Sequence, residues 1–323
     1  MKRKILSLLF ILMAFTIMIT GCEKKETPEE KIERVPDDGK ALIWEVKSDT
    51  ATVYLVGSIH LAKESTYPLK KVLMDAFEDS SILAVEADIT AESEISDDEM
   101  VLSFMYTDGS TVKDYLTPDT FEKLEKYMKT FQIIGLPTEY LYYFKPVFIS
   151  QLIEEQIYTS IGFFKTPGID EYFLNLANEK EMKIVEVESV KFQMDMMTGF
   201  SDEIQEYILL STLTSTKMSY KLGIEFMLKM WQQGDAENFS MMLKMSDYFG
   251  EVYMDEDEKR ISAEYNKIMM DDRNDGMTDK VEEFLKGNET VFYVVGSAHM
   301  FGDTGIVNQL EERGHTVTVK RGK

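Results

Sequence analysis

The chain has 323 residues, of which 44% are hydrophobic and 29% are charged, so it is long and apolar enough to bury a substantial core. Its 35 Lys and Arg residues against 58 Asp and Glu residues give a net charge of −23, which argues against nucleic-acid binding. The single cysteine excludes an intrachain disulfide framework and a cysteine-rich metal site, and the chain has only three histidines. We therefore expect any chemistry to rest on histidines, carboxylates and hydroxyls.

The first 22 residues predict an exported protein with a lipid anchor. A basic stretch over residues 2–4 precedes an apolar run over residues 5–19, and the sequence ITGC ends at Cys22. The run is shorter than the ~20 residues of a transmembrane helix, so it predicts a signal peptide over residues 1–21. The lone cysteine resembles a bacterial lipobox, in which a lipidated Cys22 would hold the protein on the cell membrane, facing outside the cytoplasm. The alternative is a soluble secreted protein that keeps one thiol.

The next segment, residues 22–40, is polar and charged and has almost no large apolar side chains. This composition predicts a lipidated cysteine followed by a disordered tether. Residues 41–323 then form the folded domain.

Within that domain, the first predicted elements are two strands, a helix and a third strand. Apolar, β-branched stretches over residues 41–46 and 50–56 predict a hairpin, and residues 67–79 have the apolar spacing of a helix. An apolar strand over residues 81–87 completes a β-loop-helix-β unit, whose crossover we expect to be right-handed.

The same order recurs at the other end of the chain, with a strand, a loop, a helix and a strand over residues 291–320. A third, weaker copy over residues 168–188 lacks the histidine. Long helical segments separate these units; they cover residues 118–130, 146–160, 202–231, 236–249 and 255–270.

We predict an α/β (α+β) fold with a central sheet built from the N- and C-terminal units and covered by helical insertions, including an insert at about residues 195–275. Two separate domains are the less favoured alternative, because terminal strands with matching loops pair most simply in one sheet.

Two of the three histidines occur in the pattern Gly-Ser-x-His, each directly after an apolar strand. These are His60 in GSIH and His299 in GSAH. Chemistry on α/β sheets gathers at the carboxyl ends of the strands, so neighbouring strands would bring both imidazoles into one crevice. Neutral imidazole binds zinc, and manganese or cobalt when carboxylates complete the shell. The alternative is a decayed repeat in which both histidines only tie down loops. His315 lacks this context and is predicted to lie at the surface.

Three carboxylates are candidates for the same site. Glu86 lies within the apolar strand AVEAD, where an acid is costly to bury without a partner, and it is the first choice as metal ligand or general base. Glu186 and Glu188 alternate along IVEVES and share one face of the sheet. Glu188 lies nearer the carboxyl edge and is the better catalytic candidate, although solvation of both acids is an equally good interpretation.

Arg273 in MMDDRNDGM has two interpretations. It is placed to clamp a substrate carboxylate or to stabilise an oxyanion. Alternatively, it lies in a turn before a helix over residues 277–286 and pairs with Asp271 or Asp272. Asp170 in PGIDE is predicted to be an acid at a helix N-terminus rather than a catalytic group.

These motifs together resemble the TraB/PrgY/GumN family over roughly residues 41–320. The resemblance rests on GSIHLA at residues 57–62, VEAD at 85–88, GIDEYFLNLANEKEMKIVEVES at 168–189 and the segment 271–320, which contains the Arg-Asn pair and GSAH. The family is similar to the animal TIKI metalloproteases. This similarity implies an α/β fold with a site at the two histidine motifs, with His60, His299, Glu86 and Arg273 at the matching positions.

The leading hypothesis is a metal-dependent hydrolase, most simply a peptidase, with a peptide or protein substrate. His60, His299 and Glu86 would hold Mn, Co or Zn and lower the pKa of a bound water. Glu86 or Glu188 would take the proton, and Arg273 would meet substrate charge. The alternatives are a metal-free hydrolase, in which a histidine activates water or Ser58 as general base, and a non-catalytic surface lipoprotein that binds a peptide. We expect no nucleic-acid partner and contact with the membrane only through the lipid; the oligomeric state is left open.

Overall fold

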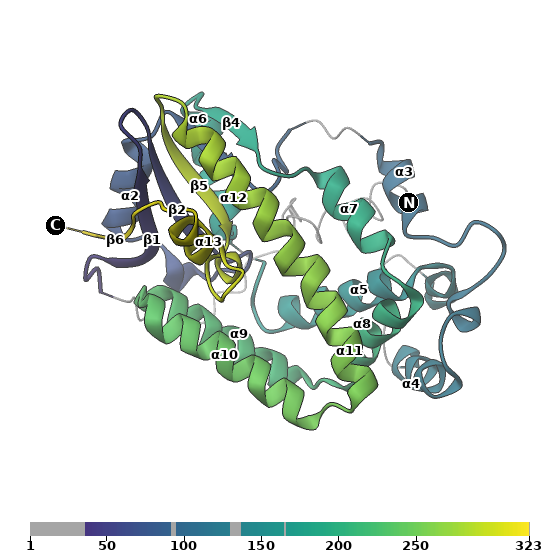
Figure 1. Ribbon diagram of the computed structural model, residues 1–323. Coiled ribbons are helices and arrows are strands. Elements are labelled where there is room, and N and C mark those ends of the chain that lie inside the picture. Colours follow the sequence, from purple (N-terminus) through teal and green to yellow (C-terminus); the bar gives the residue numbers. More distant parts are fainter. Residues whose placement is uncertain (1–35, 92–94, 130–136, 165, 323) are drawn as a thin grey trace, which may run out of the picture.

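The computed structural model describes residues 36–91, 95–129, 137–164 and 166–322 (Figure 1). The predicted signal peptide, Cys22 and most of the tether lie outside these ranges. The strands are β1 (Lys40–Lys47), β2 (Thr52–Ser58), β3 (Ile82–Val85), β4 (Lys183–Glu186), β5 (Thr290–Gly296) and β6 (Val317–Arg321). The helices are α2 (Lys71–Glu78), α3 (Asp97–Ser103), α4 (Pro118–Met128), α5 (Pro146–Ser160), α6 (Ile169–Glu179), α7 (Val190–Thr198), α8 (Asp202–Thr214), α9 (Lys217–Gln233), α10 (Ala236–Tyr253), α11 (Glu256–Asn266), α12 (Asp272–Leu285) and α13 (Ile306–Glu312).

The strands from both ends of the chain form one six-stranded sheet in the order β4-β3-β5-β2-β1-β6. Strands β4, β3, β5 and β2 pair in parallel, whereas β1 is antiparallel to both β2 and β6. Strands β2 and β5 lie side by side, and Ser58 is opposite Gly296. The predicted α/β fold with a central sheet is therefore confirmed.

Helices cover both faces of the sheet. Successive side chains of a strand point to opposite faces, and the central strands carry apolar side chains on both, so both faces must be buried. On one face, Phe292 of β5 packs against Phe77 of α2 and Phe173 of α6, with ring centroids 5.4 and 4.6 Å away. On the other face, the hydroxyl of Tyr293 donates to the carbonyl oxygen of Met277 in α12. The buried sheet residues and these helices form one apolar core.

A second apolar core lies within the helical layer beside the sheet. It is built mainly by α3, α4, α5, α7 and α8, with Phe148 and Ile149 of α5 fully buried in it. Helices α9 and α10 form a hairpin apart from this core, and Gly234 between them lies against the backbone of Lys40 and Ala41 (Figure 1). Within the described part of the chain, no helix is long and apolar enough to cross a membrane.

The predicted turn before residue 277 is wrong. Helix α11 continues through a π-helical turn, η4 (Lys267–Asp271), directly into α12, so Arg273 lies in the first turn of a helix. The single Gly276 does not break this helix, since glycine in a helix interior costs only about 1 kcal/mol relative to alanine. π-Helical turns often occur at functional sites.

Candidate active site

The two histidine motifs lie side by side where β2 and β5 end. Ser297 begins η5 (Ser297–Met300), and its hydroxyl donates to the carbonyl oxygen of Ser58 over 2.7 Å. Gly57 allows this approach, because a Cβ there would lie 3.0 Å from Ser297 Oγ. The parallel pairing of the two strands thus brings His60 and His299 to one edge of the sheet, as the sequence predicts.

The start of α6 holds the His60 loop in place. The backbone N–H of Ile169 donates to the carbonyl oxygen of Ile59 over 3.0 Å. Gly168 packs so closely against this loop that a Cβ would lie 2.3 Å from the carbonyl oxygen of His60. Only glycine fits this position without displacing backbone atoms.

His60 is paired with Asp170. Its Nδ1 lies 2.8 Å from Asp170 Oδ2, and Ser58 Oγ donates to Asp170 Oδ1 over 2.6 Å. The negative charge of Asp170 raises the pKa of His60 to about 9, against the opposing effect of burial. About half of the His60 side-chain surface (52%) is open to solvent.

Asp170 is therefore a candidate site residue, although the sequence predicted it to be only an acid at a helix N-terminus. It does lie in the first turn of α6, as predicted, but it also orients His60. The signal that could have found it is the third copy of the repeat, which places the start of α6 at the sheet edge that carries both histidines.

His299 occupies a different environment in the same site. Its side chain is buried, and its Nδ1 lies 2.6 Å from Oδ1 of Asn274. Burial is the main reason that the pKa of His299 is lowered to about 4, so the ring is neutral at pH 7. Asn274, next to Arg273 on α12, was not singled out as a partner.

Arg273 lies between Glu86 and Glu188. Its Nη2 donates to Glu86 Oε2 over 2.9 Å, and its Nε donates to Glu188 Oε1 over 2.8 Å. Gln193 of α7, which sequence reasoning missed, donates from Nε2 to both carboxylates over 3.2 and 2.9 Å. The alternative in which Arg273 pairs with Asp271 or Asp272 is wrong, since these acids contact Thr304 and Lys267. Glu188 is likewise buried in an ion pair rather than solvated.

Glu86 is a buried carboxylate with a full set of partners. Its Oε1 accepts from the backbone N–H of Gly296 over 2.5 Å, and its Oε2 accepts from Arg273 and Gln193. Burial alone would raise its pKa, but His299, Arg273, His60 and the Gly296 N–H lower it to about 2. His299 contributes a positive charge only below its own pKa of about 4. At neutral pH, Glu86 is therefore ionised while His299 is neutral.

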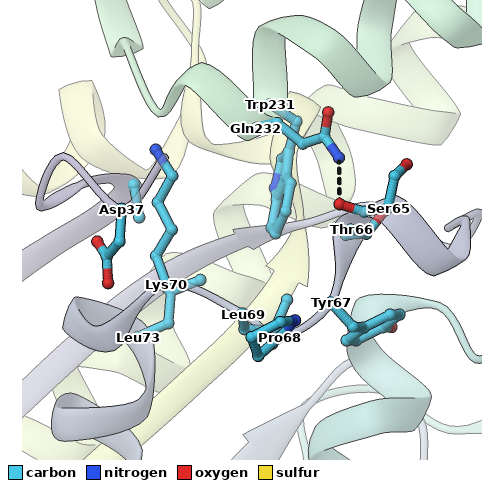
Figure 2. A pocket seen from close by; sticks show the side chains of 11 residues that line it. Asp37, Ser65, Thr66, Tyr67, Pro68, Leu69, Lys70, Leu73, Trp231 and Gln232 are labelled. Atoms are coloured by element: carbon cyan, nitrogen blue, oxygen red, sulfur yellow. Dashed lines mark hydrogen bonds between the residues drawn. The ribbon is translucent and has the colours of Figure 1, made fainter. Parts of the chain in front are cut away.

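A cavity of about 570 Å³ joins these groups. It is lined by His60, Glu86, Arg273 and His299 on the sheet side and by mainly apolar side chains of the helical layer on the other. A second, smaller cavity of about 230 Å³ lies between α2 and the end of α9 (Figure 2). Trp231 lines the smaller cavity and donates from Nε1 to the carbonyl oxygen of Gly57. Of the predicted site residues that the structure describes, none lines this cavity.

The two histidines have the bonding pattern of metal ligands. A ligating histidine usually donates its second ring N–H to an oxygen, which fixes the ring. Asp170 and Asn274 provide these oxygens at Nδ1, which leaves Nε2 of each ring for an ion or a water. The third predicted ligand fits less well, because both oxygens of Glu86 already accept hydrogen bonds. Among the described residues, no three His, Cys, Asp or Glu side chains form a group that could hold a metal ion.

A family model described as the TraB/PrgY/gumN family matches residues 42–319. The chain belongs to this family. Metalloprotease TIKI1 from Danio rerio is 20% identical over 332 residues, which covers 92% of this chain but only 65% of the TIKI1 sequence. The uncharacterized protein YbaP of Escherichia coli strain K12 is 21% identical over 258 residues, covering 80% of this chain and 87% of YbaP. No solved structure matches the chain.

Proposed function

We propose that this TraB/PrgY/gumN-family chain is a hydrolase, most simply a metal-dependent peptidase, that acts in the cavity between the sheet edge and the helical layer. The observation that carries the proposal is the convergence of His60 and His299, each oriented through Nδ1, on a cavity that also contains the ionised Glu86. The similarity to a metalloprotease supports the same class of reaction.

In the metal-dependent form, Nε2 of His299 and, after loss of its proton, Nε2 of His60 would hold a Mn, Co or Zn ion. Such an ion supplies a water with a lowered pKa and polarises a substrate carbonyl. Asp170 and Asn274 keep the rings in the ligating orientation. Arg273 donates hydrogen bonds to both Glu86 and Glu188 and holds the two carboxylates in place, and Glu86 lines the cavity. Either carboxylate would serve as proton acceptor.

A metal-free hydrolase is the second candidate, and the lack of a three-ligand group in the described residues favours it. His299 is neutral at pH 7 and would accept a proton from water, while the protonated His60 would donate one to the leaving group. Water is a better nucleophile candidate than Ser58, because the Ser58 hydroxyl is buried and donates to Asp170.

We further propose that the protein is anchored to the cell membrane through a lipid on Cys22 and faces outside the cytoplasm. The basic, apolar and ITGC segments of residues 2–22 support this location. Its substrate would then be a peptide or an exposed protein segment outside the cytoplasm, and the anchor would be its only contact with the lipid.

The test is a peptide-library digest by the purified full-length chain in detergent, read by mass spectrometry. The protein is stripped with EDTA and then supplied with Mn²⁺, Co²⁺, Zn²⁺ or no metal. We expect metal-restored cleavage that His60→Ala and His299→Ala abolish. His315→Ala is the matched control, since His315 contacts Glu282 away from the cavity and should retain full activity. Cleavage that resists chelation favours the metal-free form, and capture of peptides without cleavage favours a binding lipoprotein.

A further inference from the structure

The part of the cavity wall that α5 forms carries a carboxyl group that the proposed reaction does not use. One face of α5 lines this wall, with residues that recur at helical spacing: Val147, Ser150, Gln151, Glu154, Glu155 and Tyr158. A carboxyl group in a largely apolar wall is costly unless it meets a partner.

Glu154 and Glu155 differ in their partners. The carboxylate of Glu154 accepts hydrogen bonds from the hydroxyls of Tyr220 and Thr212 over 2.9 and 3.0 Å. Glu155 has no hydrogen bond or ion pair to any residue within the described ranges. Burial raises the pKa of Glu155 to about 8, which means that a nearby positive charge would stabilise its ionised form. A cationic group of a ligand would supply such a charge.

Aromatic rings line the same cavity. Tyr158 follows Glu155 by one turn of α5, and its ring lies edge-on to Phe164 with centroids 6.3 Å apart. The backbone of Phe164 has φ +63°, a left-handed conformation that few non-glycine residues adopt. Aromatic faces attract ammonium and guanidinium groups, and a carboxylate beside them provides the opposite charge. The chain's net charge of −23 also attracts cations to the protein as a whole.

We propose that Glu155, with the rings of Tyr158 and Phe164, binds a cationic group of the substrate. The substrate is then a peptide that carries a basic side chain or a free amino terminus beside apolar residues. Methionines at the cavity wall, including Met196, Met197 and Met227, accept apolar side chains of varied shape. This inference rests on the proposed function, because it assigns substrate selection to the proposed active-site cavity.

The test measures binding rather than cleavage, with the full-length chain in EDTA and fluorescence anisotropy as readout. Three labelled peptides share the same apolar flanks. The first peptide has a blocked amino terminus and one arginine, placed at each position in turn. The second is the same blocked peptide with norleucine in place of arginine. The third has norleucine and a free amino terminus. The first and third peptides distinguish a basic side chain from a terminal amine as the cation.

We expect a cationic peptide to bind about 10- to 100-fold more tightly than the neutral one, as is typical for a hydrogen bond to a charged group. Glu155→Gln should remove this preference, and Glu155→Lys should reverse it in favour of a peptide with glutamate. Glu122→Gln, an exposed acid on α4, is the matched control and should keep the preference. Equal affinity for cationic and neutral peptides, or an unchanged preference in Glu155→Gln, would overturn the assignment.

A pH series adds a second readout, because arginine stays charged throughout. Affinity for the arginine peptide should rise with pH, by about 10- to 100-fold in total and by at most tenfold per pH unit, up to the Glu155 pKa of about 8, and should level off above it. The other ionisable groups that line the cavity are His60, Glu86, Glu154, Tyr158, Tyr265, Arg273 and His299. The pH dependence of affinity that remains in Glu155→Gln is the contribution of these other groups. A pH profile identical to that of wild type in this variant would contradict the proposal. Selective binding without cleavage would refute the hydrolase and leave this inference standing.

Discussion

Asp170 Oδ2 lies 2.8 Å from Nδ1 of His60, although the two residues are 110 positions apart in the sequence. The contact joins the start of α6 to the loop after β2 and sets both the orientation and the charge of His60. Each consequence can be measured separately.

Replacing Asp170 with Asn should lower the pKa of His60 from about 9 towards its ordinary value of 6.5, because the carboxylate is the main cause of the shift. NMR titration of the imidazole protons can follow this change, since the chain has only three histidines. Asp75→Asn on the surface of α2 is the control and should leave all three titrations unchanged. An unaltered His60 titration in Asp170→Asn would contradict the assigned pair.

The same pair makes stability depend on pH. The folded-state pKa of His60 is higher than its unfolded value, so the pair stabilises the protein fully below about pH 6.5 and loses this effect as the pH rises through about 9. Urea unfolding should therefore show wild type more stable than Asp170→Asn at pH 6. The difference in the free energy of unfolding between the two proteins should shrink towards pH 10. A difference that grows with pH would contradict a stabilising contact between protonated His60 and Asp170.

Arg273 should stabilise the fold in addition to its place in the candidate active site. Replacing it with Ala leaves Glu86 and Glu188 buried without their cation, and breaking such a buried pair typically costs about 3–5 kcal/mol in the free energy of unfolding. Arg260 pairs with Glu203 at the surface, so Arg260→Ala should cost less than about 1 kcal/mol. Chemical denaturation measures the free energy of unfolding of both variants. Equal decreases in the two variants would contradict a stabilising role of the buried ion pairs of Arg273.

Gly168 should tolerate no side chain. In Gly168→Ala, the Cβ would lie 2.3 Å from the carbonyl oxygen of His60, so the His60 loop or α6 must move. We expect lower thermal stability together with weaker activity. Gly223→Ala in α9 is the matched control: its Cβ has no neighbour within 4 Å, so it should stabilise the helix by about 1 kcal/mol. A Gly168→Ala variant as stable and active as wild type would disprove the close approach.

Much of this arrangement was predictable from local sequence. The glycines and apolar runs at both ends of the chain indicated that β2 and β5 would pair and bring His60 and His299 together. The sequence also singled out Glu86, Glu188 and Arg273, and the structure places all three in one hydrogen-bonded group. Their catalytic and metal-binding roles remain predictions.

The partners of these residues could not be predicted in the same way. Gln193 lies in no motif, and Asn274 lies in the Arg-Asn pair, which does not show what the amide contacts. Their roles depend on how α7 and α12 pack against the sheet. Asp170 looked like an ordinary acid at a helix N-terminus because that description is also true. The helix predicted over residues 277–286 begins earlier, because α11 continues through η4 into α12.

Metal affinity should depend on the residues that orient the histidines. Isothermal titration of the EDTA-stripped protein with Mn²⁺, Co²⁺ or Zn²⁺ should give one site that His60→Ala or His299→Ala removes. Asn274→Ala should weaken it about 10- to 100-fold, the usual effect of losing the hydrogen bond behind a ligand. His315→Ala should bind as wild type does. Metal binding unaffected by His60→Ala and His299→Ala would place the ion elsewhere.

The most direct test of the shared role of the histidines is a double-mutant cycle on peptide cleavage, with rates for wild type, His60→Ala, His299→Ala and the double variant. When two side chains act together on one reacting centre, removing either one abolishes the rate contribution of both. We predict that each single change lowers the rate by at least about 100-fold and that the double change lowers it no further. Independent losses that multiply in the double variant, or full activity in either single variant, would contradict the account.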